Sequence, residues 1–120
     1  MRILYITNSI GMGGASVAII NVLTHLIQQG IIPMVTCPAE GLFSNELKKM
    51  GISVQFIGNP LDIYPKINSW RSYIKYPYSL LQLICKRHSA YKKLCSCVEY
   101  FKPDIIHTNS IIHEKVVLSL

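Results

Sequence analysis

Three glycines lie in the segment Asn8-Ser9-Ile10-Gly11-Met12-Gly13-Gly14-Ala15-Ser16. This segment follows a short apolar run and is followed by a longer one. An apolar strand, a glycine turn and an apolar helix form the strand–loop–helix arrangement of many phosphate sites. Glycines let the backbone approach a ligand and adopt positive φ without strain. The N–H groups at a helix start also carry partial positive charge. Two interpretations stay open from this segment alone: a phosphate-binding loop, or a tight turn without a ligand.

The glycine spacing departs from the dinucleotide-binding pattern G-x-G-x-x-G. Gly11 and Gly13 fill its first two positions, but Ser16 stands at the third. An acidic residue should follow the second strand and bind a ribose, yet that strand ends at Cys37-Pro38, with Glu40 only beyond the proline. An NAD(P)-binding domain of an oxidoreductase is therefore a disfavoured alternative.

The composition is that of one globular domain, with 120 residues, 50% of them apolar and 15% charged. The segment from Asp62 to Lys102 holds eight basic and two acidic residues, which accounts for the whole net charge of +6. A basic nucleic-acid-binding module is a further alternative, but no such motif accompanies the charge, and we expect no nucleic-acid partner. The four cysteines lack C-x-x-C spacing, so we expect free thiols in a reducing cytoplasm and no metal site.

Apolar patterning predicts strands over residues 2–7, 32–37, 53–57 and 104–108. Helices are expected over residues 15–29 and 111–120, from an N-cap at Ser44 to Gly51, and over 70–101 with an interruption near Tyr76-Pro77. Residues 61–69 are expected to be irregular. The long helix should bury a face made of Leu80, Ile84, Tyr91, Leu94, Cys95, Val98 and Phe101.

Strands that alternate with helices form parallel sheets with right-handed crossovers. We therefore predict an α/β fold, a Rossmann-like doubly wound parallel sheet with strand order 3-2-1-4. The switch point of such a sheet lies between its first and fourth strands, where ligands bind at the C-terminal edge. Two segments would flank that crevice: residues 8–16 and His107-Thr108-Asn109-Ser110.

Two parts of the chain resemble the retaining, family 4-type glycosyltransferases of the GT-B fold. They are R-I-L-Y-I with the following G-M-G-G-A, and the segment Lys102-Pro103-Asp104-Ile105-Ile106-His107-Thr108-Asn109-Ser110, which is similar to the family's P-D-I-I-H-T-H-S. The resemblance implies that residues 1–120 are the N-terminal, acceptor-side domain, incomplete at its C-terminus, with the donor-binding domain beyond Leu120. It implies a cytoplasmic hexosyltransferase of polysaccharide or glycolipid biosynthesis, and a fragment that is inactive alone.

The same resemblance assigns roles to residues of the two segments. Gly13, Gly14 and Ala15 would bind the phosphates of a nucleotide-sugar donor, while His107 and Asn109 would contact a glycan or lipid-linked acceptor. It implies no separate cofactor, no metal and no catalytic residue within residues 1–120. The chain departs from the family at Ser16, which replaces a glutamate, and at Asn109, which replaces a second histidine. A purely structural, hydrogen-bonded role for His107 stays open.

The basic segment also contains aromatic residues, namely Trp70, Tyr73, Tyr76 and Tyr78. Aromatic and basic side chains together suit the surface of an anionic membrane, so a peripheral membrane association is a further expectation. A solvated helix face is the alternative. The sequence contains no uninterrupted apolar run of about 18 residues that would span a bilayer.

Overall fold

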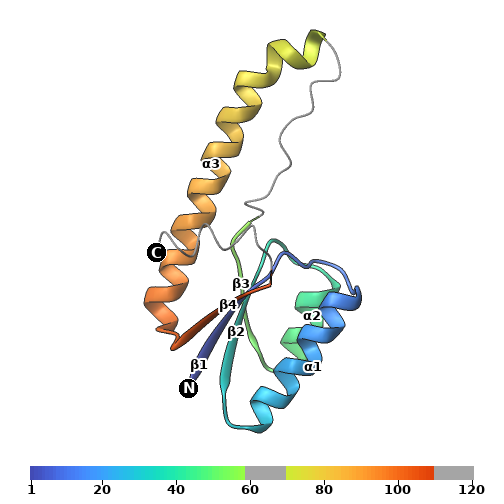
Figure 1. Ribbon diagram of the computed structural model, residues 1–120, viewed down its shortest axis with the longest axis vertical. Helices are drawn as coiled ribbons and strands as arrows, with labels where there is room; N and C mark the ends of the chain where they lie inside the picture. Colours follow the sequence, from blue (N-terminus) through green and yellow to red (C-terminus); the bar gives the residue numbers. More distant parts are fainter. Residues whose placement is uncertain (59–69, 110–120) are drawn as a thin grey trace.

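The computed structural model describes residues 1–58 and 70–109, and Figure 1 shows a sheet with helices on both of its faces. The elements are β1 (Arg2–Ile6), α1 (Gly14–Gln28), β2 (Ile32–Cys37), α2 (Leu42–Lys49), β3 (Ser53–Phe56), α3 (Trp70–Phe101) and β4 (Ile105–Thr108). The four strands are parallel and lie in the order β3-β2-β1-β4. The α/β, Rossmann-like sheet expected from the sequence is confirmed. The loop expected over residues 61–69 and the helix expected over 111–120 lie outside the described residues.

The alternation of side chains along β1 divides the core into two parts. Ile3 and Tyr5 belong to the cluster on the side of α1 and α2, together with Ile19, Leu23, Val35, Cys37, Phe43, Leu47 and Ile52. Leu4 and Ile6 belong to the cluster on the side of α3, together with Met34, Ile57, Leu94 and Phe101. Both faces of the central strand are therefore covered, as a doubly wound sheet requires.

Glycines follow the ends of α1 and α2, and Gly51 is the end that the sequence predicts for the second of these helices. Gly30 follows α1 with φ +77°, and Gly51 follows α2 with φ +76°, the left-handed conformation that glycine adopts without strain. The start of α2 differs from the prediction, because Gly41 and not Ser44 is its N-cap. The Ser44 hydroxyl lies inside the first turn, where it accepts a 3.0 Å hydrogen bond from the Gly41 N–H and donates one of 2.9 Å to the Gly41 carbonyl.

The interruption predicted near Tyr76-Pro77 is wrong, because α3 continues through Pro77. A proline removes one backbone donor and crowds the preceding turn, which kinks a helix and does not always end it. Figure 1 shows α3 bending within its first turns. The predicted buried face is only partly correct: Leu94 and Phe101 are buried, whereas Ile84 is 64% exposed. The side chain of Leu80 lies outside the described set.

Candidate functional site

Tyr5 and His107 form the floor of a crevice between the two central strands. Tyr5 of β1 and His107 of β4 are direct partners in the parallel register, and their ring centroids lie 4.7 Å apart with the planes tilted by 44°. Both side chains therefore point to the face of the sheet that α1 covers. Tyr5 is buried whereas His107 is exposed, and burial raises the pKa of the Tyr5 phenol above its usual value. Tyr5 is thus a neutral partner for the imidazole.

Helix α1 supplies the wall of this crevice and encloses a cavity of about 230 Å³. Its lining residues are Tyr5, Ala15, Ala18, Ile19, Val22, His107 and Asn109. The cavity brings together three of the five site residues proposed from the sequence, Ala15, His107 and Asn109. Gly13 and Gly14 directly precede Ala15 and place their backbone at the same end of α1. The cavity thus joins the glycine segment to the end of β4, at the switch point of the sheet.

The start of α1 presents backbone donors. Gly13 is the N-cap, with extended backbone and no side-chain capping bond, and the first turn contains no acidic residue. The first helical hydrogen bond runs 3.0 Å from the Val17 N–H to the Gly13 carbonyl. The N–H groups of Gly14, Ala15 and Ser16 come before this bond and therefore have no carbonyl partner within the helix. An anion that reached this helix start would meet several N–H donors and the positive end of the helix dipole.

The conformation of the loop does not itself require its three glycines. Gly11, Gly13 and Gly14 are not among the positive-φ glycines of the described chain. Among the described residues, no neighbouring atom lies within 4 Å of the place that a Cβ would occupy at any of the three. These three glycines therefore do not form a tight turn that depends on the left-handed conformation. The segment leaves bare backbone facing open space, the condition for close approach of a ligand.

Two hydrogen bonds and one backbone contact hold the glycine segment in place, and none of them is marked by a local sequence pattern. The hydroxyl of Ser16, a buried residue, donates a 2.8 Å hydrogen bond to the Gly11 carbonyl and closes the loop from within. The Phe43 N–H, at the start of α2, donates a 3.2 Å bond to the Ile10 carbonyl. The backbone of Gly41 also packs against Ile10. No sequence signal marks this approach, because it joins segments about 30 residues apart.

The P-D part of the second motif has a structural role at the opposite end of β4. The Asp104 carboxylate accepts a 2.7 Å hydrogen bond from the Arg2 N–H, and the Asp104 N–H donates a 2.8 Å bond to the Arg2 carbonyl. These bonds fix the register of β4 against β1. At the other end, the Asn109 N–H donates a 3.0 Å bond to the Ile6 carbonyl. The side chains of His107 and Asn109 are held at the crevice by a strand anchored at both ends.

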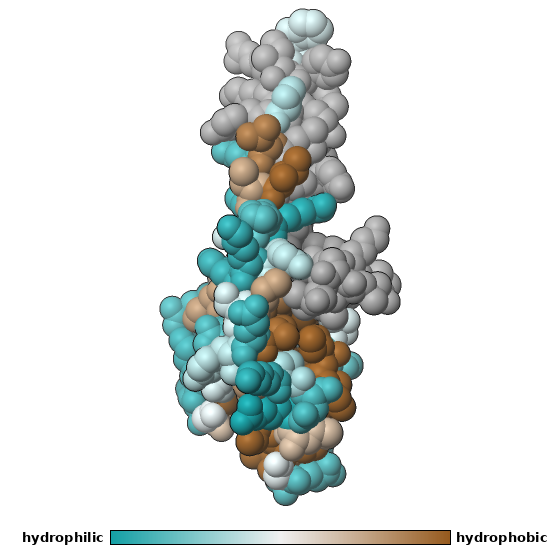
Figure 2. Space-filling model, turned by 90° about the vertical axis from the view of Figure 1, so that its left-hand side faces the viewer, coloured by the Kyte–Doolittle hydropathy of each residue, from teal (hydrophilic) through white to brown (hydrophobic). Residues whose placement is uncertain are grey.

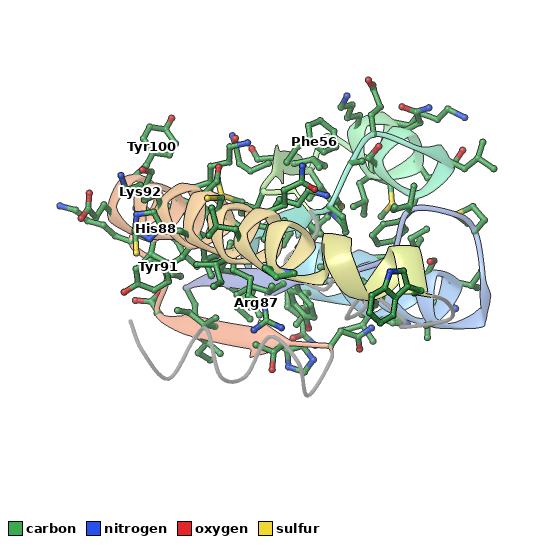
Figure 3. The ribbon with its side chains drawn as sticks, turned by 90° about the horizontal axis from the view of Figure 1, so that it is seen from above. Phe56, Arg87, His88, Tyr91, Lys92 and Tyr100 are labelled. Atoms are coloured by element: carbon green, nitrogen blue, oxygen red, sulfur yellow. The ribbon has the colours of Figure 1, made fainter. Side chains whose placement is uncertain are left out.

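A larger cavity, of about 500 Å³, lies on the α3 side of the sheet. It is lined by Met34, Gln55, Phe56, Lys93, Ser96, Cys97 and Tyr100, and Figure 3 shows Phe56 and Tyr100 on one side of α3 with Arg87 on the other. The two cavities share no lining residue. The larger one lacks a helix start and does not lie at the switch point, so we place the candidate site at the smaller one.

Histidine, cysteine and acidic side chains are the other groups of the chain that could carry chemistry. The described residues contain no cluster of three or more histidine, cysteine or acidic side chains suited to a metal. All four cysteines are free, and burial raises the pKa of the Cys37 thiol to about 11, which makes that thiol a poor nucleophile at neutral pH. Within residues 1–58 and 70–109, no helix is long and apolar enough to cross a membrane.

Comparison of the chain with protein-family models gave no match, and comparison with the curated proteins gave none either. The fold and the crevice therefore define the class to which the chain can be assigned. It is a small α/β domain with a four-stranded parallel sheet of order 3-2-1-4, and its candidate site lies at the switch point.

Proposed function

We propose that this chain is the acceptor-side domain of a GT-B-type glycosyltransferase, which moves a sugar from a nucleotide-sugar to a glycan or lipid-linked acceptor. One observation carries the proposal: Ala15 at the start of α1 and His107 and Asn109 at the end of β4 line the same cavity. A transferase of this kind must hold a diphosphate and an acceptor next to each other. A helix start beside a polar strand end is suited to that task.

The proposed donor contact is made by the backbone of Gly13, Gly14 and Ala15. When the sugar leaves, negative charge grows on the departing nucleoside diphosphate, and oriented N–H donors stabilise that charge without rearranging. The bare backbone around the two glycines supports this role, since a side chain there would keep phosphate oxygens at a distance. No acidic residue of the first turn opposes an anion.

The proposed acceptor contact is made by His107 and Asn109. Both side chains are exposed at the crevice, and an imidazole and an amide can each donate and accept a hydrogen bond, as recognition of sugar hydroxyls requires. The Tyr5 ring supports His107 from one side, while Ala18 and Val22 of α1 offer an apolar wall. The arrangement suits an acceptor with one polar and one apolar face.

Ser16 disfavours the alternative that the chain is an NAD(P)-binding domain of an oxidoreductase. In a dinucleotide site the third position of the glycine pattern allows close packing of the helix on the sheet, whereas here a buried serine closes the loop by bonding Gly11. The Cys37-Pro38 end of β2 offers no carboxylate for a ribose. A nucleic-acid-binding role rests on the basic charge alone, and no observation on the described residues favours it.

Replacing Gly14 by aspartate tests the donor role. A carboxylate at this position would face the diphosphate, so Gly14→Asp should weaken binding of uridine or guanosine diphosphate at least about tenfold, which is about 1.4 kcal/mol. The fold should not suffer, because a Cβ meets no atom there and an acidic residue in the first helical turn stabilises a helix by about 0.3–1 kcal/mol. Ligand-observed NMR titration of the chain measures the affinity.

Asn21→Asp is the matched control, because it adds the same charge to an exposed position two turns further along α1. We expect it to change diphosphate binding less than twofold (about 0.4 kcal/mol). Equal affinities of the Gly14→Asp variant and the unaltered chain would contradict the phosphate role. Absence of diphosphate binding by the unaltered chain at millimolar concentrations would contradict it as well.

A further inference from the structure

The cavity on the α3 side of the sheet has no part in the candidate site, and its volume of about 500 Å³ exceeds that of the crevice. Its described lining comes from two sides: Met34 of β2 with Gln55 and Phe56 of β3, and Lys93, Ser96, Cys97 and Tyr100 of α3. Pockets that hold small molecules have volumes of about 300–1,000 Å³. This cavity is therefore large enough to hold a small organic ligand.

The cavity results from the way in which α3 lies on the sheet. Leu94 and Phe101 belong to the cluster that covers Leu4 and Ile6 of the central strand β1. The four lining residues of α3 fall within a sector of about 100°, and the middle of that sector lies about 100° from the direction of Leu94 and Phe101. One flank of the helix therefore faces β2 and β3 from the side, and the cavity lies between that flank and the two strands.

Lys93 carries the only charge in the described lining. It makes no ion pair with another described residue. Burial raises the pKa of the Cys97 thiol, which keeps that group neutral. A molecule in this cavity therefore meets one positive charge and no negative charge from the described lining.

The neutral polar groups of the lining add hydrogen-bond donors. The Gln55 amide and the Tyr100 hydroxyl can both donate, and neither forms a side-chain hydrogen bond with another described residue. The Ser96 hydroxyl donates a 3.1 Å bond to the Lys92 carbonyl, so its hydrogen is already engaged. A carboxylate only accepts hydrogen bonds and is bound most strongly by charged donors. One ammonium group with two further donors therefore suits a carboxylate.

We propose that this cavity binds an aromatic carboxylate. Lys93 pairs with the carboxylate. Met34, Phe56 and Tyr100 supply the apolar part of the lining, which favours a flat ring through stacking and sulfur contacts. A single lysine matches a group with a single negative charge, whereas a nucleoside diphosphate carries more charge and suits the several N–H donors at the start of α1. The inference rests on this cavity alone and stands independently of the proposed transferase activity.

Naphthoate and naphthalenemethanol test the proposal as a matched pair of probes, because they share one ring system and differ in charge. A two-dimensional amide NMR titration of the chain measures affinity and location together. Naphthoate should shift the signals of Gln55, Ser96 and Cys97 and bind at least about threefold more tightly than the alcohol, as an exposed ion pair allows. Equal affinities, or shifts that spare these three residues, would overturn the proposal.

An exposed apolar patch on α3 makes residue-specific signals necessary. Leu81 is 65% exposed and Ile84 is 64% exposed, and Figure 2 shows apolar residues on α3 above the sheet. Neither residue lines the cavity, and Ile84 precedes Ser96 by about 18 Å along the helix. Shifts confined to residues 81–84 would mean that naphthoate binds the exposed patch only, and they would overturn the proposal.

Lys93 and its neighbour Lys92 allow a matched pair of variants. Both are exposed lysines of α3, but of the two only Lys93 lines the cavity. Lys93→Gln should weaken naphthoate binding at least about threefold and leave naphthalenemethanol binding unchanged, whereas Lys92→Gln should leave both unchanged. Equal weakening by the two substitutions would indicate a general attraction to the basic helix and would overturn the proposal.

Two further measurements locate the ligand. Ser96→Trp places an indole ring at the cavity from an exposed position, so it should abolish binding of both probes without disturbing the buried face of α3. Uridine diphosphate should leave naphthoate binding unchanged, because the two cavities share no lining residue. Naphthoate binding that survives Ser96→Trp, or that uridine diphosphate displaces, would overturn the proposal.

Discussion

At Gly41 a Cβ atom would lie 2.5 Å from the Ile10 carbonyl oxygen and 2.7 Å from its Cγ2. The backbone there is extended, so close approach and not φ accounts for the glycine. Gly41→Ala must push the glycine segment and α2 apart. We expect it to lower the free energy of unfolding by about 1–3 kcal/mol, the usual cost of inserting a methyl group into a packed contact, as measured by urea denaturation.

Gly11→Ala is the control for that substitution. A methyl group at Gly11 meets no atom of the described residues within 4 Å, and Gly11 is not among the positive-φ glycines, so the stability should change by less than about 0.5 kcal/mol. A Gly41→Ala variant as stable as the Gly11→Ala variant would mean that the loop is not held by α2. The contrast separates a glycine that the fold requires from one that it does not.

The sequence did not reveal which of these glycines packs closely. Gly11, Gly13 and Gly14 lie in an evident motif, yet the described chain makes no packing demand on them, whereas Gly41 lies in no motif and is tightly packed. Both family patterns present Ser16 only as a departure, although its hydroxyl closes the loop. Local sequence shows residue types and spacing, but contacts between distant segments depend on the completed fold.

At the scale of elements, α3 combines two regions with different surroundings. Residues 70–89 project from the sheet, while Leu94 and Phe101 pack against it. Backbone amides of an unsupported helix open locally, and those of a packed helix open only with larger parts of the fold. We expect amide hydrogens in residues 90–101 to exchange on the order of 100-fold more slowly than those in 81–89, measured by NMR in deuterated water without lipid.

Uniform protection along α3 would contradict this division, because it would mean that something in the chain supports residues 70–89. The helical period of apolar residues predicted one buried face for the whole helix, and that prediction failed at Ile84. Periodicity shows which side of a helix is apolar but not whether a sheet extends far enough to cover it. Pro77 likewise led to a predicted interruption, whereas α3 continues through it.

At the scale of the whole molecule, the sheet order followed from the alternation of strands and helices. Right-handed crossovers leave few arrangements for four parallel strands, and the order β3-β2-β1-β4 is the one expected. The shape was not foreseen: the Cα radius of gyration is 16.1 Å, against about 14 Å for a compact chain of this length. Residues 70–89 of α3 contribute to this difference, since they project away from the sheet.

The candidate site was also predictable at this scale, because topology brings the C-terminal ends of β1 and β4 together. Ala15, His107 and Asn109 were proposed from motifs about 90 residues apart, and they line one cavity. What the motifs could not supply was the detail of that cavity: the Tyr5 ring against His107 and the apolar wall of α1. These contacts depend on side-chain packing, which spacing does not encode.

The most direct test of the central claim is a two-dimensional amide NMR titration of the chain with uridine and guanosine diphosphate. Binding at the switch point should shift the amide signals of Gly13, Gly14 and Ala15 most, with smaller shifts at His107 and Asn109. The second cavity supplies an internal control in Gln55 and Ser96, which line it and should not respond. Shifts confined to that cavity or spread along α3, with none in the glycine segment, would contradict the assignment of the site.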